Sequence, residues 1–171
     1  MTMSRDDHTD VDSRRALVES IHASSTLLVF AVAGGGNAAI TDLLDVPGAS
    51  RTVLEVRVPY AESALREFSA NDAGAVSQAM AEAMAAACLD RARDLAPPGE
   101  PVIGVACTAA LASDRPKRGD HRAHIVVAGP AGCDHSLITL EKGRDDRRGE
   151  DRIVADAVLQ AIATSCGIEV S

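Results

Sequence analysis

The chain has 171 residues, of which 46% are hydrophobic and only 2% aromatic, and tryptophan is absent. This length fits one domain that buries a core without disulfides or metal ions, and small aliphatic side chains suit a layered α/β core. The net charge of −8 is the opposite of the global basic bias typical of nucleic-acid-binding proteins, so nucleic acid is not an expected partner. No apolar run approaches the roughly 20 residues of a membrane span, and no targeting signal is evident, so we expect a cytoplasmic protein.

The first half of the chain alternates predicted helices and strands. Residues 1–12 are polar and acidic, and we expect a flexible leader there before a single domain at 13–171. The run LLVFAVA has the length and character of a buried strand, and alternating residues after the turn VPGAS indicate a second strand that Pro59 ends. In order, this half is predicted to contain a helix at 13–23, a strand at 27–33, a helix at 37–44 and a strand at 53–58.

The second half is predicted to open with the longest helix, because apolar residues recur there at helical spacing. The segment GPAGCD predicts a hairpin between two later strands, and Gly167 suits the end of the last helix, whose buried stripe is expected to include Ile153 and Val154. The buried stripe of the helix predicted at 76–95 is expected to contain Val76, Met80, Ala83, Ala87 and Leu95. The predicted elements are a helix at 76–95, strands at 102–107, 123–128 and 136–140, and a helix at 150–165.

This order of elements predicts the fold class. The β-α-β-α order of the first half favours parallel crossovers, and the later hairpin adds antiparallel strands, so the sheet should be mixed. Helices that cover both faces of such a sheet give a single three-layer α/β domain. The four cysteines match no zinc-binding spacing, and we expect reduced thiols.

A glycine-rich turn, Gly34-Gly35-Gly36-Asn37, lies between the first predicted strand and the next helix. Free N–H groups where a helix begins bind anions, and glycine lets a phosphate approach the backbone closely. The spacing is not that of the dinucleotide-binding fingerprint. Two interpretations stay open: a phosphate-binding turn, or glycines that only make a tight turn.

A basic loop, SDRPKRGDHR at 113–122, follows the strand predicted at 102–107. Lysine and arginine are the usual ligands of phosphate, and loops that follow buried strands often carry function. Arg115, Lys117 and Arg118 are therefore predicted to bind phosphate, with a solvated loop of surface ion pairs as the alternative. The charges at 144–151 are interpreted as a helix cap with surface ion pairs.

Three further residues are candidates for chemistry. Cys107 and Thr108 end a buried strand, and strand ends of open α/β sheets are where ligands bind. Either is a possible nucleophile if a base lies near, although Cys107 also fits a small core residue. His121 is a candidate acid or base. No metal site is predicted, because His121 and His124 on one strand would face opposite sides of the sheet.

Several segments resemble the C-terminal domain of the CinA family, which includes nicotinamide-mononucleotide deamidases. They are the glycine loop followed by DVPGAS (45–50), a strand ending in Tyr60, and VIGVACTAAL followed by RPKRG (115–119). The likeness covers about residues 27–168. It implies that family's layered α/β fold and an amidohydrolase that converts nicotinamide mononucleotide to nicotinate mononucleotide and ammonia.

The chain departs from the family at two catalytic positions. Active members resemble ESCTGG after the first strand, with the serine as nucleophile, whereas the equivalent stretch here, 32–37, contains no Ser, Thr or Cys. A lysine expected soon after Tyr60 is absent from 61–69. We therefore expect no covalent acyl-enzyme and little or no deamidation of nicotinamide mononucleotide.

Two functions stay open. The first is an enzyme that hydrolyses a C–N bond of a pyridine nucleotide or related phosphate-bearing metabolite by a non-serine route. The second is a catalytically inactive nucleotide-binding or regulatory module. No cofactor, nucleic acid or membrane is expected for either, and the family resemblance together with the alanine-rich helix predicts a homo-oligomer built on dimers. The candidate catalytic residues are Tyr60, Cys107, Thr108 and His121, and the candidate binding residues are Gly34, Gly35, Gly36, Asn37, Arg115, Lys117 and Arg118.

Overall fold

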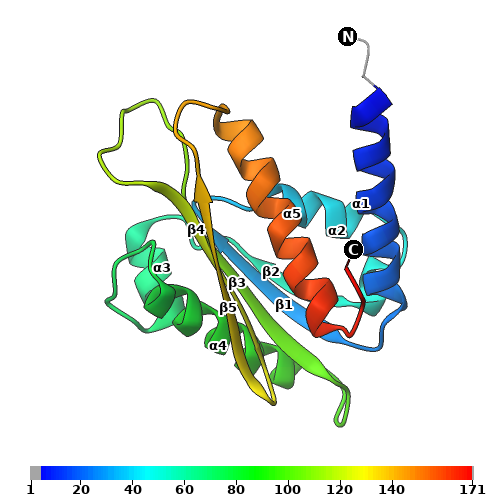
Figure 1. The fold of residues 1–171 in the computed structure, drawn as a ribbon. Coiled ribbons are helices and arrows are strands. Elements are labelled where there is room, and N and C mark those ends of the chain that lie inside the picture. Colours follow the sequence, from blue (N-terminus) through cyan, green and yellow to red (C-terminus); the bar gives the residue numbers. More distant parts are fainter. Residues whose placement is uncertain (1–4, 171) are drawn as a thin grey trace.

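The computed structural model describes residues 5–170, which form a five-stranded sheet with helices on both sides (Figure 1). In chain order the elements are α1 (Arg5–Ala23), β1 (Leu27–Ala33), α2 (Ala38–Asp45), a short 3-10 turn (Ala49–Arg51), β2 (Val53–Arg57), α3 (Glu62–Ser69), α4 (Gln78–Leu95), β3 (Val102–Ala110), β4 (His121–Gly129), β5 (Gly132–Leu140) and α5 (Arg147–Ser165).

The strands lie in the order β2-β1-β3-β4-β5. β1 pairs in parallel with β2 and β3, because helical crossovers connect β1 to β2 and β2 to β3. β4 is antiparallel to β3, and β5 is antiparallel to β4 through a two-residue hairpin turn at Pro130 and Ala131. The predicted mixed sheet, with parallel crossovers first and a hairpin later, is confirmed.

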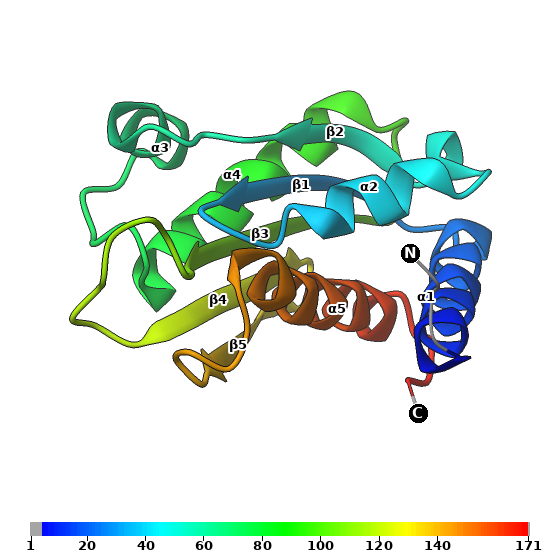
Figure 2. The same cartoon turned by 90° about the horizontal axis from the view of Figure 1, so that it is seen from above.

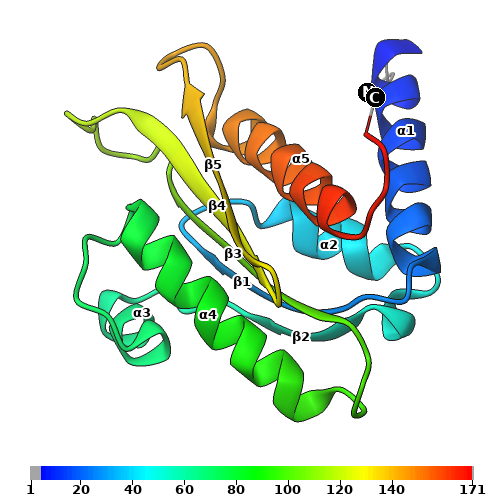
Figure 3. The same cartoon turned by 60° about the horizontal axis from the view of Figure 1, so that its bottom comes forward.

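Figure 3 shows the sheet between two layers of helices. α1, α2 and α5 cover one face, where Phe30, Val105 and Ile162 belong to one apolar cluster. α3 and α4 cover the other face, where Met80, Met84 and Val126 belong to a second cluster. The predicted three-layer α/β domain is confirmed. Among the described residues, every helix is too short or too polar to cross a membrane.

The first helix differs from the prediction in where it begins. α1 starts at Arg5, so residues 5–12, expected in a flexible leader, are helical. Asp10 lies within the helix and accepts a hydrogen bond from Arg14, one turn further on. The part of the leader at 1–4 lies outside the described residues.

The two long helices bury faces that overlap the predicted apolar stripes only in part. α4 begins where the Ser77 hydroxyl caps the N–H of Met80, but Leu95 is 40% exposed and Ala83 and Ala87 are only half-buried. The residues that α4 buries are Met80, Ala81, Met84, Ala85, Cys88, Leu89 and Ala92. In α5, Ile153 is likewise exposed, whereas Val154 is buried as predicted.

Candidate active site

The candidate site lies at one edge of the sheet, where the parallel strands β1, β2 and β3 end. β4 begins and β5 ends at this same edge, because both run antiparallel to their neighbours. In Figure 2 the turns that follow β1 and β3 and the beginning of α5 lie together at this end of the molecule. Ligands of α/β sheets bind at the carboxyl ends of parallel strands, so most of the predicted site residues meet at the expected edge.

The glycine loop, residues 34–37, packs tightly against β3. A Cβ atom at Gly34 would lie 2.2 Å from the carbonyl oxygen of Ala109, and Gly34 has a φ of +85°. A Cβ atom at Gly35 would lie 2.6 Å from Cδ1 of Leu111. Glycine is therefore required here by contact with the neighbouring strand and by backbone conformation, independently of any ligand.

The free N–H groups of the glycine loop bind a carboxylate that the chain itself supplies. Asp151 Oδ1 accepts hydrogen bonds from the N–H groups of Gly36 (2.7 Å) and Asn37 (3.1 Å). Asp151 Oδ2 accepts one from the N–H of Ala38 (2.9 Å), the first residue of α2. An internal carboxylate thus occupies N–H groups of the kind that bind anions where a helix begins.

A buried carboxylate orients His121 at the beginning of β4. Glu150 is 1% exposed, and its Oε1 lies 2.6 Å from Nδ1 of His121. Its Oε2 accepts a 2.6 Å hydrogen bond from the N–H of Ala112. An ionised carboxylate only accepts hydrogen bonds, so with Glu150 in that form Nδ1 is the donor, and the lone pair of a neutral ring then lies on Nε2.

The second ring nitrogen of His121 is open to the edge. In the described part of the chain every buried side-chain nitrogen and oxygen has a hydrogen-bond partner, whereas Nε2 of His121 makes no hydrogen bond. Nε2 is therefore reached by solvent, although the side chain as a whole is only 11% exposed. A carboxylate–histidine pair with one free nitrogen is an arrangement suited to proton transfer.

Arg147 joins the glycine loop to the segment that leads toward His121. Its Nη2 donates to the carbonyl of Gly34 (3.0 Å), and its Nη1 donates to the carbonyl of Ala112 (2.9 Å). With Glu150 and Asp151, it makes the first two turns of α5 the element that holds the edge together. Their spacing in the sequence favoured a helix cap with surface ion pairs, and only the density of charge at the beginning of a helix distinguishes them there.

The predicted basic loop ends at residue 120, because His121 and Arg122 belong to β4, and residues 113–120 are exposed. Lys117 Nζ donates to the carbonyl of Leu111 (2.8 Å), which folds the loop back toward β3. Lys142 Nζ donates to the carbonyl oxygens of Lys117 (2.9 Å) and Arg118 (3.4 Å). Within the described residues the guanidinium groups of Arg115 and Arg118 make no hydrogen bond, so both are free to meet an anion.

The remaining candidate catalytic residues lie apart from His121. Cys107 is fully buried beneath the glycine loop, and burial raises the pKa of its thiol, which opposes formation of a thiolate. Thr108 is buried, and its hydroxyl donates to the carbonyl of Ala75. Tyr60 follows β2 at the same edge, but its side chain is 68% exposed and makes no hydrogen bond to the described residues.

His124 lies on the opposite face of the sheet from His121, as their odd spacing predicts. A 2.9 Å hydrogen bond joins Nδ1 of His124 to Nε2 of His135 on β5. Burial lowers the pKa of His124, and His135 and Arg122 lower it further. No three potential metal ligands cluster anywhere in residues 5–170.

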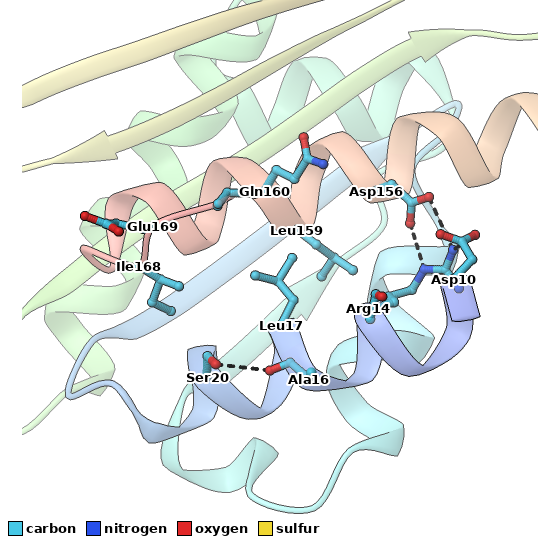
Figure 4. A pocket seen from close by; sticks show the side chains of 12 residues that line it. Asp10, Arg14, Ala16, Leu17, Ser20, Asp156, Leu159, Gln160, Ile168 and Glu169 are labelled. Carbon is cyan, nitrogen blue, oxygen red and sulfur yellow. Dashed lines mark hydrogen bonds and ion pairs between the residues drawn. The ribbon is translucent and has the colours of Figure 1, made fainter. Parts of the chain in front are cut away.

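A separate cleft of about 330 Å³ lies between α1, α5 and the C-terminal segment (Figure 4). Arg14 donates from Nε to Asp156 (2.7 Å) and from Nη2 to Asp10 (3.0 Å). Arg152 also binds Asp156 and reaches Asp42 on α2 (2.6 Å). These ion pairs fasten α1 and α2 to α5, so we assign this region to packing and not to the candidate site.

The fold is that of CinA-type α/β proteins. The structure is similar to the competence/damage-inducible protein CihA from Agrobacterium tumefaciens, with a TM-score of 0.68, 20% identity, and coverage of 90% of this chain and 95% of that one. For a CinA superfamily protein from Klebsiella pneumoniae the TM-score is 0.66 and the identity 12%, with coverage of 92% of this chain and 96% of that one. For one from Enterobacter cloacae the TM-score is 0.62 and the identity 13%, with coverage of 97% of this chain and 94% of that one. The sequence itself matches no family model and no curated protein.

Proposed function

We propose that this CinA-like protein is a hydrolase that cleaves a C–N bond of a pyridine nucleotide or related phosphate-bearing metabolite, without a covalent intermediate. The observation that carries the proposal is the buried Glu150 carboxylate, which holds His121 with one ring nitrogen free at the edge of the sheet. Arg115 and Arg118 supply free cationic groups for a phosphate on the neighbouring loop.

In the proposed reaction, His121 acts as a general base toward water. Nε2 takes a proton from a water molecule whose oxygen attacks the carbonyl carbon of the substrate amide. The C–N bond then breaks, and the imidazolium returns the proton to the leaving nitrogen. Water is consumed, and the products are a carboxylic acid and ammonia or an amine. Glu150 is a positioning residue in this scheme, because it fixes the ring and its tautomer.

The direct test is to incubate the protein with nicotinamide mononucleotide, from which we expect little or no ammonia, and with NAD and ADP-ribose, and to measure product formation and thermal shift in parallel. For a substrate that is turned over, His121→Asn should lower kcat by about 10²–10⁴-fold, the usual contribution of general base catalysis, with little change in KM. Turnover that survives in His121→Asn would refute the proposed role.

A matched control is available on the same strand. His124→Asn changes a histidine on the other face of the sheet and should leave kcat unchanged. Glu150→Gln should lower kcat and leave KM near its wild-type value, because the ring loses its carboxylate partner while the binding loop is untouched. A change in KM alone would show that Glu150 only shapes the binding site.

A second candidate function is a catalytically inactive nucleotide-binding or regulatory module. The observation that favours it is the Asp151 carboxylate in the glycine loop, which removes that loop from the groups available to a substrate. A thermal shift with any of the three compounds, without product, would support this alternative.

The proposal includes a homo-oligomer built on dimers. α4 exposes Ala79 and Ala86 and leaves Ala83 half-buried on the face that turns away from the sheet. Small side chains let a second helix approach closely. Light scattering at micromolar concentration should give at least twice the chain mass of 17.7 kDa, and a monomer mass would contradict this part of the proposal.

A further inference from the structure

We infer that Asp151 is a specificity-determining residue: its carboxylate occupies the anion site of the glycine loop, so the loop selects against negatively charged ligand groups. The inference rests on the proposed function only in taking this edge as the ligand site. It assigns to Asp151 the role of an internal competitor, whose position an external anion must take in order to bind the loop.

The contacts show a complete anion complex. One carboxylate oxygen accepts from the N–H groups of Gly36 and Asn37, and the other accepts from that of Ala38, at 2.7–3.1 Å. These are consecutive N–H groups where α2 begins, and such groups bind phosphate in other proteins. The same donors cannot serve a second anion while Asp151 is in place, and its charge repels one that approaches.

The position of Asp151 on α5 makes the competition specific to this loop. Asp151 follows Glu150 directly, and Glu150 is held by Ala112 and His121. The two carboxylates thus belong to adjacent residues of one helical turn. Among the predicted phosphate ligands, Arg115 and Arg118 on the basic loop are exposed and make no hydrogen bond within the described residues. A bound metabolite would therefore place its phosphate at the basic loop and a neutral or cationic group at the glycine loop.

The test uses inorganic phosphate as the probe and backbone amide signals as the readout. The amides of Gly36, Asn37 and Ala38 are followed by ¹H–¹⁵N spectra during titration of wild type and Asp151→Ala. We expect no saturable shift of these amides in wild type. In Asp151→Ala they should shift saturably. The apparent affinity should be at least tenfold tighter than the limit that the wild-type titration sets, because three donors lose their internal acceptor.

Two further variants keep the result interpretable. Asp151→Asn keeps an acceptor oxygen but loses the charge, so it should bind phosphate at the loop with intermediate affinity, and it provides the answer if Asp151→Ala does not fold. Asp145→Asn removes an equal charge from an exposed site before α5 and should behave as wild type. Unmoved loop amides in folded Asp151 variants, or equal shifts in wild type, would overturn the inference.

The same spectra separate this inference from the proposed function. Amides of Arg115, Lys117 and Arg118 report on phosphate at the basic loop. If they stay silent in every variant while the glycine loop of Asp151→Ala responds, the phosphate-binding role of the basic loop fails and the role of Asp151 stands. If instead the basic-loop amides respond and the glycine-loop amides of Asp151→Ala do not, only the role inferred for Asp151 is refuted.

Discussion

The two loops that leave the same edge of the sheet satisfy their polar groups in opposite ways. The glycine loop after β1 is closed: Asp151 binds its N–H groups, Arg147 binds the carbonyl of Gly34, and β3 leaves no room for side chains. The basic loop after β3 is open, with exposed guanidinium groups at Arg115 and Arg118. A glycine-rich turn after a strand is therefore not by itself a free phosphate site, since the chain can supply the anion.

The largest effect is expected from forcing a side chain into the closed loop. Gly34→Ala should lower the free energy of unfolding by about 3 kcal/mol or more, because left-handed backbone costs roughly 1–2 kcal/mol in alanine and overpacking adds roughly 1–3 kcal/mol. Gly99→Ala is the matched control: its φ of +86° is similar, but no atom lies within 4 Å of the added Cβ. Urea denaturation of both variants checks this, and equal losses would show that packing against β3 contributes nothing.

Substitutions in the open basic loop should affect ligand binding more than stability. Lys117→Ala with Arg118→Ala should change stability by no more than about 1 kcal/mol per residue, since exposed charges contribute little. The affinity for a phosphate-bearing ligand should fall, because two cationic groups are lost. Calorimetry with the compound that gives the strongest thermal shift measures the second effect, and an unchanged affinity would remove this loop from the site.

Cysteine labelling compares buried and exposed parts of the molecule. Burial raises the pKa of Cys88 to about 12 and also raises that of Cys107, while Cys133 on β5 is exposed. A thiol reagent should therefore modify Cys133 in the native protein and reach Cys88 and Cys107 only after unfolding. Rapid native modification of Cys107, detected by peptide mass spectrometry, would show that the glycine loop opens.

The smallest expected effect concerns His124, on the face away from the site. Its pKa is lowered in the folded protein relative to the usual value of 6.5, so the unfolded chain binds the proton more readily. Stability should consequently fall as the pH drops through about 6.5 and below. His124→Gln should flatten this dependence in thermal denaturation between neutral and mildly acidic pH, and an unchanged slope would assign the effect to other groups.

Much of the fold follows from the sequence where apolar character is unambiguous. β1 has the predicted bounds. Seven apolar residues in a row that end at Gly34 are too few for a buried helix and have the length of a buried strand. Gly167 ends α5 with a φ of +76°, as predicted for a left-handed cap. The buried face of α4 was not predictable from spacing, because alanine occurs on several sides of that helix. α3 was missed because Leu65 is the only large apolar residue that this short helix buries.

The sequence predicts where the candidate site lies but not which hydrogen bonds join its residues. The basic loop was proposed because loops that follow buried strands often carry function, and His121 because an imidazole can act as acid or base. The roles of Glu150 and Asp151 were not, since Asp151 and the N–H it binds on Gly36 are separated by 115 positions. A run of mixed charges at the beginning of a helix does not reveal which carboxylates turn inward.

Tyr60 gives the molecule a built-in optical reporter. It is the only tyrosine, and the chain has no tryptophan, so tyrosine emission comes from one phenol ring. That ring is 68% exposed beyond the end of β2, on the side of the sheet edge where we expect ligands. An aromatic or charged compound that settles there will quench or shift its fluorescence, and the signal needs no label and no assignment. The same scarcity of chromophores makes protein concentrations from near-ultraviolet absorbance unreliable, so peptide-bond absorbance is the better basis for stoichiometry.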